Sequence, residues 1–268
     1  MKRGVTAVAV AIGCLLATAG VARSQAPAED EKKAMDQAEA ACAKGKADRC
    51  LLLAAGYATG KGGRAVDAAK AADLSQKACS AKLGKGCLML AAAFQDGKGR
   101  PKDAAKAKAM FEKACTLKEA LGCEALGLSL ASGNDPKPED LKKAAPYLQK
   151  ACDLKSGNAC FMLGLVYEEG RGAARDAARA AALYGQACDL GAAPGCTNAA
   201  GLAMKAKDDA KAVVALEKAC GLDDPNGCGM LGLCYVQGKG VAQDAEKGRY
   251  LLAKACKLGF APACQMRD

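Results

Sequence analysis

Fourteen of the sixteen cysteines in this 268-residue chain form seven pairs, and the two members of every pair lie eight residues apart. The first members recur after 37, 36, 37, 36, 32 and 36 residues. The pairs are Cys42/Cys50, Cys79/Cys87, Cys115/Cys123, Cys152/Cys160, Cys188/Cys196, Cys220/Cys228 and Cys256/Cys264. This period predicts an internal repeat, so the other motifs have to be interpreted in phase with the cysteines.

The residues after each second cysteine have the pattern of an amphipathic helix. Leucine stands three residues after it in five of six repeats, and alanine or glycine stands four residues after it in all six. Seven residues after it, four repeats have tyrosine or phenylalanine. Offsets of 0, 3, 4 and 7 lie on one face of a helix. We expect the small residue to let a neighbouring helix approach closely.

A second helix is predicted after a glycine-rich loop such as "DGKGR" at 96–100. The glycines end the first helix and allow the positive φ angles of a tight turn. An aspartate follows, with Lys or Arg three residues later, which suits the helix dipole and allows an ion pair. The aspartates predicted to start these helices, rather than to form active sites, are Asp67, Asp103, Asp140, Asp176, Asp208 and Asp244.

Each repeat is therefore predicted to be two antiparallel helices, and no segment has the alternation of a strand. Stacked helix pairs form an all-α solenoid. Two repeats are irregular, because the interval 188–220 is short and residues 132–140 replace the glycine loop. We predict one solenoid domain over residues 29–268, with about six repeats and a cap helix at each end.

The N-terminus has the features of a targeting segment. Lys2 and Arg3 precede an apolar stretch, and small residues at 20–22 suit signal peptidase. We predict a cleaved secretory signal at 1–22, a short linker at 23–28, and a secreted or periplasmic bacterial protein. A lipid anchor at Cys14 is the alternative, but the apolar residues after it favour a cysteine that is discarded with the signal. No later stretch is long and apolar enough to span a membrane.

The formal net charge of +10 does not predict nucleic-acid binding. The 39 basic residues are interspersed with 29 acidic ones, and no aromatic residues alternate with basic ones for base stacking. Histidine is absent, which removes the usual general base and the usual nitrogen ligand of zinc. We expect no metal, no cofactor and no nucleic acid.

Two segments carry a family resemblance. "LGLVYEEGRGAARDAARAAALYGQACDLG" (163–191) and "MLGLCYVQGKGVAQDAEKGRYLLAKACKLG" (230–259) resemble the Sel1-like repeat, a relative of the tetratricopeptide repeat. With its paired cysteines the chain is similar to the disulfide-rich branch typified by the Helicobacter cysteine-rich proteins. The resemblance implies a secreted right-handed superhelix with one disulfide per repeat. It also implies an alternative function, because some members are described as penicillin-binding proteins with weak β-lactamase activity.

Three interpretations of the cysteine pairs can be compared. Structural zinc sites and redox relays usually contain C-x-x-C, which is absent here. A secretory signal adds an oxidising compartment, so we favour a disulfide that clamps one helix pair to the next. Cys234 lies outside the pairs. We interpret it as a small buried thiol, with a nucleophile or an intermolecular disulfide as the alternatives.

The serine β-lactamase motifs are missing. None of the serines at 24, 75, 80, 129, 132 and 156 has lysine three residues later, and K-T-G is absent. We therefore expect a repeat scaffold without obvious catalytic machinery. The penicillin-binding or weak β-lactamase-like protein remains the alternative.

A candidate binding face lies opposite the packing face of the first helices. Methionine and leucine recur there, two and five residues after the second cysteine, and flexible methionine suits a peptide or protein partner. In a tetratricopeptide-like superhelix this face would line the concave surface; the alternative is that its residues pack between adjacent first helices. The residues predicted for it are Met89, Leu128, Met162, Leu165, Met230 and Leu233.

Overall fold

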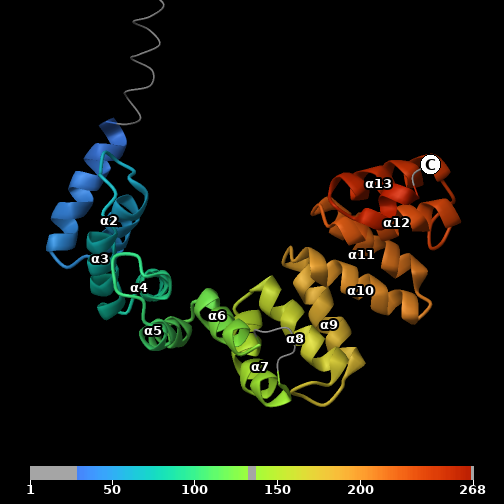
Figure 1. The fold of residues 1–268 in the computed structure, drawn as a ribbon, viewed down its shortest axis with the longest axis horizontal. Coiled ribbons are helices and arrows are strands. Elements are labelled where there is room, and N and C mark those ends of the chain that lie inside the picture. Colours follow the sequence, from blue (N-terminus) through green and yellow to red (C-terminus); the bar gives the residue numbers. More distant parts are fainter. Residues whose placement is uncertain (1–28, 132–136, 267–268) are drawn as a thin grey trace, which may run out of the picture. The chain divides into compact units, whose positions relative to one another are not determined.

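The computed structural model describes residues 29–131 and 137–266, and the regular secondary structure in these ranges is entirely helical (Figure 1). Contacts within the chain divide it into two compact units, Met1–Leu117 and Lys118–Asp268. The predicted signal, the linker and Cys14 lie outside the described residues and stay predictions.

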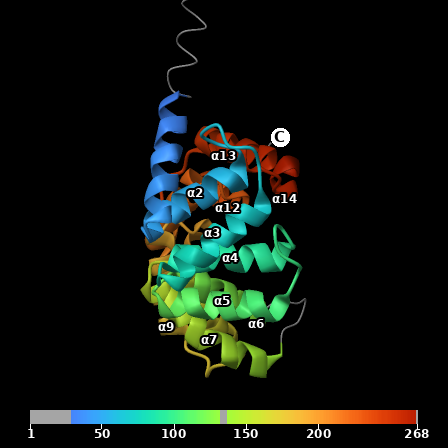
Figure 2. The same ribbon diagram turned by 90° about the vertical axis from the view of Figure 1, so that its left-hand side faces the viewer.

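The first unit is a stack of helices, of which Figure 2 shows α2 to α5. Its first described helix covers residues 29–43. The helices that follow are α2 (Ala47–Thr59), α3 (Ala68–Ser80), α4 (Gly84–Asp96) and α5 (Ala104–Thr116). From α2 onward each helix contacts the next, so elements that are adjacent in sequence are adjacent in space.

The second unit continues the same architecture. Its helices are α6 (Ala120–Leu130), α7 (Pro138–Asp153), α8 (Gly157–Glu169), α9 (Ala177–Asp189), α10 (Ala193–Lys205), α11 (Asp209–Gly221), α12 (Pro225–Gln237), α13 (Ala245–Lys257) and α14 (Ala261–Gln265). Here too each helix contacts the next, and α8 and α10 also contact the first helices of neighbouring pairs. The prediction of an all-α solenoid of helix pairs is confirmed.

The cysteine phase correctly identifies the buried face of the first helices. In α8, Cys160, Leu163 and Gly164 are all buried. Gly164 packs against the ring of Tyr184 in α9, and a Cβ atom on this glycine would come within 2.6 Å of that ring. A larger side chain would push the two helices apart, so the small residue does permit their close approach.

The predicted aspartates act as N-caps. In five second helices the carboxylate accepts a hydrogen bond from the backbone N–H three residues later, at 2.9–3.1 Å. This bond satisfies one of the donors left free at a helix start. The five capping residues are Asp67, Asp103, Asp176, Asp208 and Asp244.

The basic residue three positions after the cap mostly has a different partner from the one expected. It lies over the aromatic ring at the end of the first helix, with 4.0–5.6 Å between the cationic group and the ring centroid. The pairs are Lys70 over Tyr57, Lys106 over Phe94, Arg179 over Tyr167 and Lys247 over Tyr235. Lys106 also forms the predicted ion pair with Asp103, at 3.1 Å.

The same ring residues fix where the second helix begins. In each of these four repeats the carbonyl of the aromatic residue accepts a hydrogen bond at 2.9 Å from the N–H of the capping aspartate. Ring, cap and cation therefore form one local unit. The sequence pattern predicts its three members separately but not the contact between the ring and the cation.

One of the six predicted helix starts is wrong. Asp140 lies inside the first turn of α7, which begins at Pro138 with Lys137 as its N-cap. Proline is favoured at the first helical position, because its φ angle suits a helix and its missing N–H is not needed there. Lys143 lies 3.8 Å from Asp140, so the predicted ion pair is present in this helix.

The short interval 188–220 nevertheless forms a helix pair, α10 and α11. Ala203 stands where other repeats have the ring, and its carbonyl accepts the Asp208 N–H at 2.9 Å. Asp208 then caps α11. The shorter turn thus keeps the hydrogen bond that starts the second helix and leaves out the glycine loop and the ring.

Candidate functional site

The disulfides staple the turns between repeats. Each joins the last turn of one helix to the first turn of the next, with Cα atoms 4.4–4.8 Å apart. The bonds are Cys42–Cys50, Cys79–Cys87, Cys152–Cys160, Cys188–Cys196, Cys220–Cys228 and Cys256–Cys264. Cys115 and Cys123 are also disulfide-bonded. The prediction of one disulfide per repeat is confirmed.

A close contact of small residues accompanies the disulfide, and sequence reasoning missed it. Alanine precedes the first cysteine of all seven pairs, and glycine precedes the second cysteine in four of them. A Cβ atom on Gly86 would come within 2.6 Å of Ala78, and one on Gly195 would come equally close to Ala187. The recurrence of alanine and glycine directly before the cysteines is the sequence pattern that could have predicted this contact.

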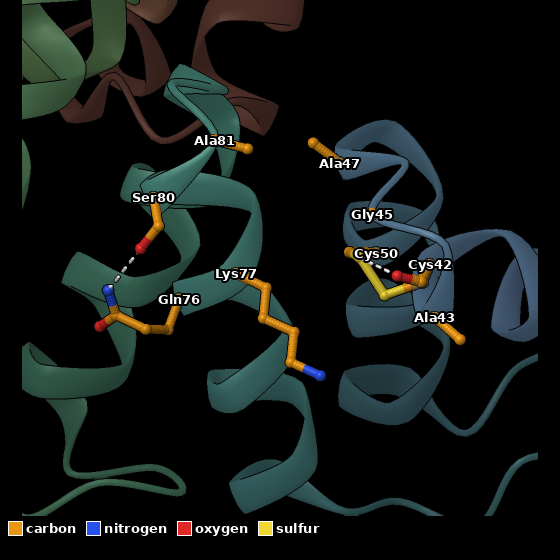
Figure 3. A pocket seen from close by; sticks show the side chains of 9 residues that line it. All are labelled: Cys42, Ala43, Gly45, Ala47, Cys50, Gln76, Lys77, Ser80 and Ala81. Atoms are coloured by element: carbon orange, nitrogen blue, oxygen red, sulfur yellow. Dashed lines mark hydrogen bonds between the residues drawn. A yellow bond between two sulfur atoms is a disulfide. The ribbon is translucent and has the colours of Figure 1, made fainter.

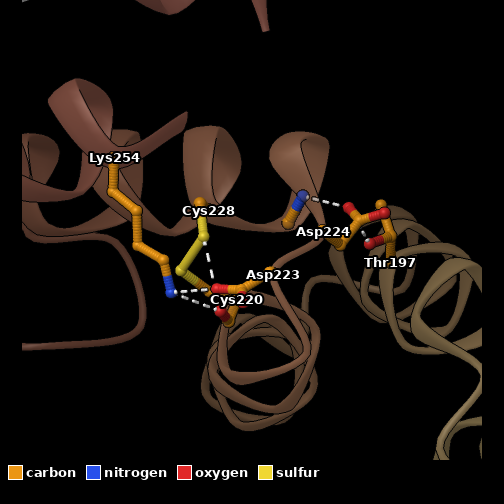
Figure 4. Close-up of a disulfide and its surroundings, with 7 residues drawn as sticks. Thr197, Cys220, Asp223, Asp224, Cys228 and Lys254 are labelled. Atoms are coloured by element: carbon orange, nitrogen blue, oxygen red, sulfur yellow. Dashed lines mark hydrogen bonds and ion pairs between the residues drawn. A yellow bond between two sulfur atoms is a disulfide. The ribbon is translucent and has the colours of Figure 1, made fainter. Parts of the chain in front are cut away.

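Polar contacts between repeats surround the Cys220–Cys228 turn (Figure 4). Lys254 in α13 donates to the Cys220 carbonyl at 2.8 Å and pairs with Asp223 at 2.7 Å. Asp224 caps α12 and accepts a hydrogen bond from Thr197 in α10 at 3.0 Å. One turn is therefore held by the repeats before and after it.

Cys234 is the one thiol outside a disulfide among the described residues. It is 3% exposed and belongs to the apolar cluster around Leu231 and Tyr235. Burial raises the pKa of the Cys234 thiol. A nucleophile requires the thiolate, so this environment supports the interpretation as a buried core thiol.

Several of the serines scanned for catalysis have structural partners. Ser75 is buried and donates to the Ala71 carbonyl at 2.7 Å. Ser156 caps α8 and donates to the buried Glu124 carboxylate at 2.6 Å, which connects α8 with α6. The alternative function, a penicillin-binding or weak β-lactamase-like protein, stays a prediction, and nitrocefin turnover by the oxidised protein would test its hydrolytic part.

Residues 29–131 and 137–266 contain neither a candidate metal site nor a candidate membrane span. No group of three or more Cys, Asp or Glu residues there is arranged to hold a metal ion. None of the helices described is long and apolar enough to cross a membrane.

The predicted binding face is partly exposed in both units. Met162 and Leu165 in α8, and Met230 and Leu233 in α12, each keep part of their surface in solvent. Met230 and Leu233 also pack against the buried cluster of their unit. Leu128 in α6 is 36% exposed, and α6 contacts α8.

In the first unit, Met89 of α4 is also partly exposed and packs against a cluster that contains Leu53 and Tyr57. Complete burial of Met89, Met162 and Met230 would have excluded a binding groove, and none of the three is fully buried. Met89, Met230 and Leu233 therefore pack against buried clusters and also keep part of their surface in solvent.

A polar group joins α8, α9 and α10 in the second unit, and α10 contacts both α8 and α12, which carry the two apolar parts of this face. Glu168 of α8 accepts hydrogen bonds from the Tyr184 hydroxyl at 2.7 Å and from Lys205 of α10 at 3.3 Å. Burial and the bond to Glu168 raise the pKa of the Tyr184 phenol. Asn198, also on α10, is partly exposed and acts against this rise in the Tyr184 pKa. Sequence reasoning did not identify this group.

Antiparallel helix pairs stapled at their turns define a helical-repeat scaffold. Sel1 repeats match residues 50–83, 84–118, 120–156, 157–191 and 225–260. These matches cover more than half of the chain, which therefore belongs to the Sel1 repeat family. The short α10–α11 repeat lies outside the matched segments.

Solved structures share the fold of this chain. The crystal structure of c5321, a protective antigen of uropathogenic Escherichia coli with an SLR fold, is 22% identical, with a TM-score of 0.77. The match covers 85% of this chain and 50% of that chain, so this chain spans half the length of the antigen. A Sel1 repeat protein from Oxalobacter formigenes is 21% identical, with a TM-score of 0.67, over 89% of this chain and 96% of the other.

Helicobacter pylori cysteine rich protein B is 34% identical over 62% of this chain and 95% of that chain, with a TM-score of 0.25. No curated protein matches the chain. Disulfides persist in oxidising compartments, so the stapled turns place the folded protein outside the cytoplasm.

Proposed function

We propose that this protein is an extracytoplasmic scaffold that binds a segment of a partner protein along the first helices of its second unit. The observation that carries this proposal is the partial exposure of Met162, Leu165, Met230 and Leu233 on α8 and α12. Leucine and methionine at these positions offer apolar, adaptable contact surface.

The centre of the face supports the same function. Gly201 of α10 lies between the two apolar parts, and a Cβ atom placed on it would meet nothing within 4 Å. Space is therefore available where α8 and α12 have Leu165 and Leu233. Beside it, the amide of Asn198 offers both a donor and an acceptor to a peptide group of the partner. An apolar surface with a few fixed polar groups is typical of peptide-binding sites.

The disulfides have a supporting role in this proposal. Each disulfide fixes the start of a first helix to the end of the second helix before it. The contact residues of α8, α10 and α12 therefore need little ordering when a partner binds. A preorganised surface loses less conformational entropy on binding.

Photocrosslinking tests the proposal. A photoreactive phenylalanine analogue at Leu165 or Leu233 should crosslink a partner from the periplasm or secretome, and mass spectrometry would identify it. The same analogue at Val214, a 56% exposed residue of the second helix α11, should not.

The affinity of the identified partner then measures the contribution of the face. Leu165→Asp with Leu233→Asp should weaken binding by about 2 kcal/mol or more, because apolar contacts are lost and charges are desolvated. Val214→Asp should leave the affinity unchanged. Equal crosslinking at Val214 and Leu165 would contradict the proposal.

A further inference from the structure

The turns of the first unit carry an unbalanced positive charge. Five lysines on or beside these turns are exposed, and a sixth, Lys113, is half-buried. Asp48 is the one acidic residue in the turn segments 43–49 and 80–86, and it pairs with Arg49 at 3.2 Å. The basic turn surface consists of Lys44, Lys46, Lys77, Lys82, Lys85 and Lys113, none of which has an ion-pair partner in the described part of the chain.

Two of the equivalent lysines in the second unit, Lys218 and Lys254, have ion-pair partners, whereas Lys150 has none among the described residues. Lys218, two residues before a first cysteine, pairs with Asp189 of the preceding turn at 2.8 Å. Lys77 and Lys113 occupy the same repeat position, but the residues that correspond to Asp189 are Ala43 and Ser80. The first unit therefore has cationic groups in the same place without the carboxylates.

Caps at the starts of the first helices differ only in part between the units. In the second unit Ser156 and Asp224 cap α8 and α12, and no side chain caps α6 or α10. No side chain caps α2 or α4, which begin after Lys46 and Leu83. The uncapped N–H groups add partial positive charge to the edge where the lysines lie.

A hollow of about 510 Å³ lies between two of these turns (Figure 3). The Cys42–Cys50 disulfide and Ala47 border it on one side, and Ala81 borders it on the other. Lys77 extends into the space from α3, toward the turn that carries Ala43. A largely apolar wall beneath a cationic group accommodates an apolar side chain next to a carboxylate.

We propose that the basic turn surface binds an acidic segment of a polypeptide, with one apolar side chain of that segment in the hollow. Carboxylates complement lysine charges spaced along consecutive turns. No aromatic side chain lies on these turns, so base stacking of a nucleic acid has no platform. The large apolar residues exposed in this unit, Leu52 and Val66, lie off the turns, so no apolar anchor for a membrane accompanies the lysines.

Fluorescence anisotropy tests this site with a short labelled peptide of Asp and Glu residues around one leucine. The wild-type protein should bind the peptide at low ionic strength and more weakly as salt is added, since salt screens charge pairs. The peptide with Asn and Gln in place of the acids should not bind.

The same double charge reversal, made in each unit in turn, shows which unit binds the peptide. Lys77→Glu with Lys82→Glu should weaken binding at least about tenfold, because attraction becomes repulsion. Lys150→Glu with Lys155→Glu makes the same change at the same repeat positions of the second unit and should change it less than about twofold. Lys77→Gln with Lys82→Gln should also weaken binding, and it keeps the test valid if charge reversal disturbs folding.

Competition by anionic phospholipid vesicles and by a single-stranded oligonucleotide completes the experiment. Neither should displace the peptide at equal charge concentration. Absence of peptide binding, equal loss in both charge-reversal variants, or stronger binding of vesicles or oligonucleotide would each overturn the proposal. Leu165→Asp should leave peptide binding unchanged, which separates this surface from the proposed first-helix face.

Discussion

At the scale of the residue, one turn position needs an unusual backbone in every repeat. Three residues after each first cysteine the φ angle is positive. Glycine, which adopts this conformation without strain, occupies three of the seven positions. The glycines are Gly45, Gly191 and Gly259, and the other positions hold Lys82, Lys118, Lys155 and Asp223.

Replacing one of these lysines by glycine should stabilise the fold. A residue with a Cβ atom costs about 1–2 kcal/mol in the left-handed region, while the greater freedom of unfolded glycine offsets about 0.5–1 kcal/mol. Lys155→Gly should therefore raise the free energy of unfolding by about 0.5–1 kcal/mol in urea titrations. Lys150→Gly, in the last turn of α7, should lower it. A loss of stability in Lys155→Gly would contradict this explanation of the turn.

The thiol of Cys234 should be unreactive in the native protein, since it is 3% exposed and burial raises its pKa. In protein prepared without residues 1–22, a thiol reagent at neutral pH should label no cysteine under native conditions. The same protein in denaturant should show a single reactive thiol. Rapid labelling of Cys234 without denaturant would contradict its assignment to the core.

At the scale of the element, the starts of the second helices combine several weak interactions at one place. The capping carboxylate, the carbonyl of the ring residue and the cation over the ring meet within one turn, as in Asp176, Tyr167 and Arg179. Each interaction contributes about 1 kcal/mol or less, but together they fix the residue where the helix begins.

Two alanine substitutions at the same phase should have different effects. Asp176→Ala removes an N-cap and should lower the free energy of unfolding by about 1 kcal/mol. Asp140→Ala removes a first-turn acid that is not the cap and should cost about 0.5 kcal/mol or less. Chemical denaturation of both variants measures the difference. Equal losses would mean that the cap geometry is not the source of the stability.

The α8–α9 pair should lose stability in alkali through Tyr184. Burial and the hydrogen bond to Glu168 raise the pKa of this phenol in the folded state. The contribution of Tyr184 to the free energy of unfolding is complete below about pH 10, the ordinary pKa of tyrosine. It falls above this pH, because the phenol in the unfolded chain then loses its proton while the phenol in the folded protein keeps it. The stability of Tyr184→Phe should decline less steeply above pH 10 than that of the wild type. Tyr250→Phe, at a 70% exposed position, is the control and should retain the wild-type slope.

At the scale of the whole molecule, stability is expected to spread along the repeats rather than to arise from one centre. In both units each pair packs mainly on its neighbours in sequence, which is typical of solenoids. Many of the buried side chains are alanine and cysteine, and these bury little apolar area. The disulfides supplement this core by restricting the unfolded chain.

Removing one staple should therefore have a measurable but limited effect. Replacing Cys152 and Cys160 by serine should cost about 2.5 kcal/mol, the chain-entropy value for a loop of this length. The turn should still form, because the Lys155 and Ser156 N–H groups bond to carbonyls of α7 at 2.9 Å. Calorimetry of the variant and of the fully reduced wild type would show a larger loss on complete reduction. A reduced wild type as stable as the oxidised one would contradict the role of the disulfides.

The repeat, the helix pairs and most helix starts can be predicted from the amino-acid sequence. Those features depend on local patterns that recur in phase, such as the cysteine spacing, the buried Leu163 and Gly164, and caps like Asp176. These features can be predicted because the same physical requirement is met by the same residue types in each repeat.

The partners of these residues depend on how the helices pack against one another. The folded structure placed Arg179 over Tyr167, moved the start of α7 to Pro138, and joined Glu168 to Tyr184 and Lys205 across three helices. It also left Met162 partly exposed while burying its neighbour Leu163. Such outcomes depend on which side chains from separate elements arrive at the same point, and no single segment of sequence contains that information.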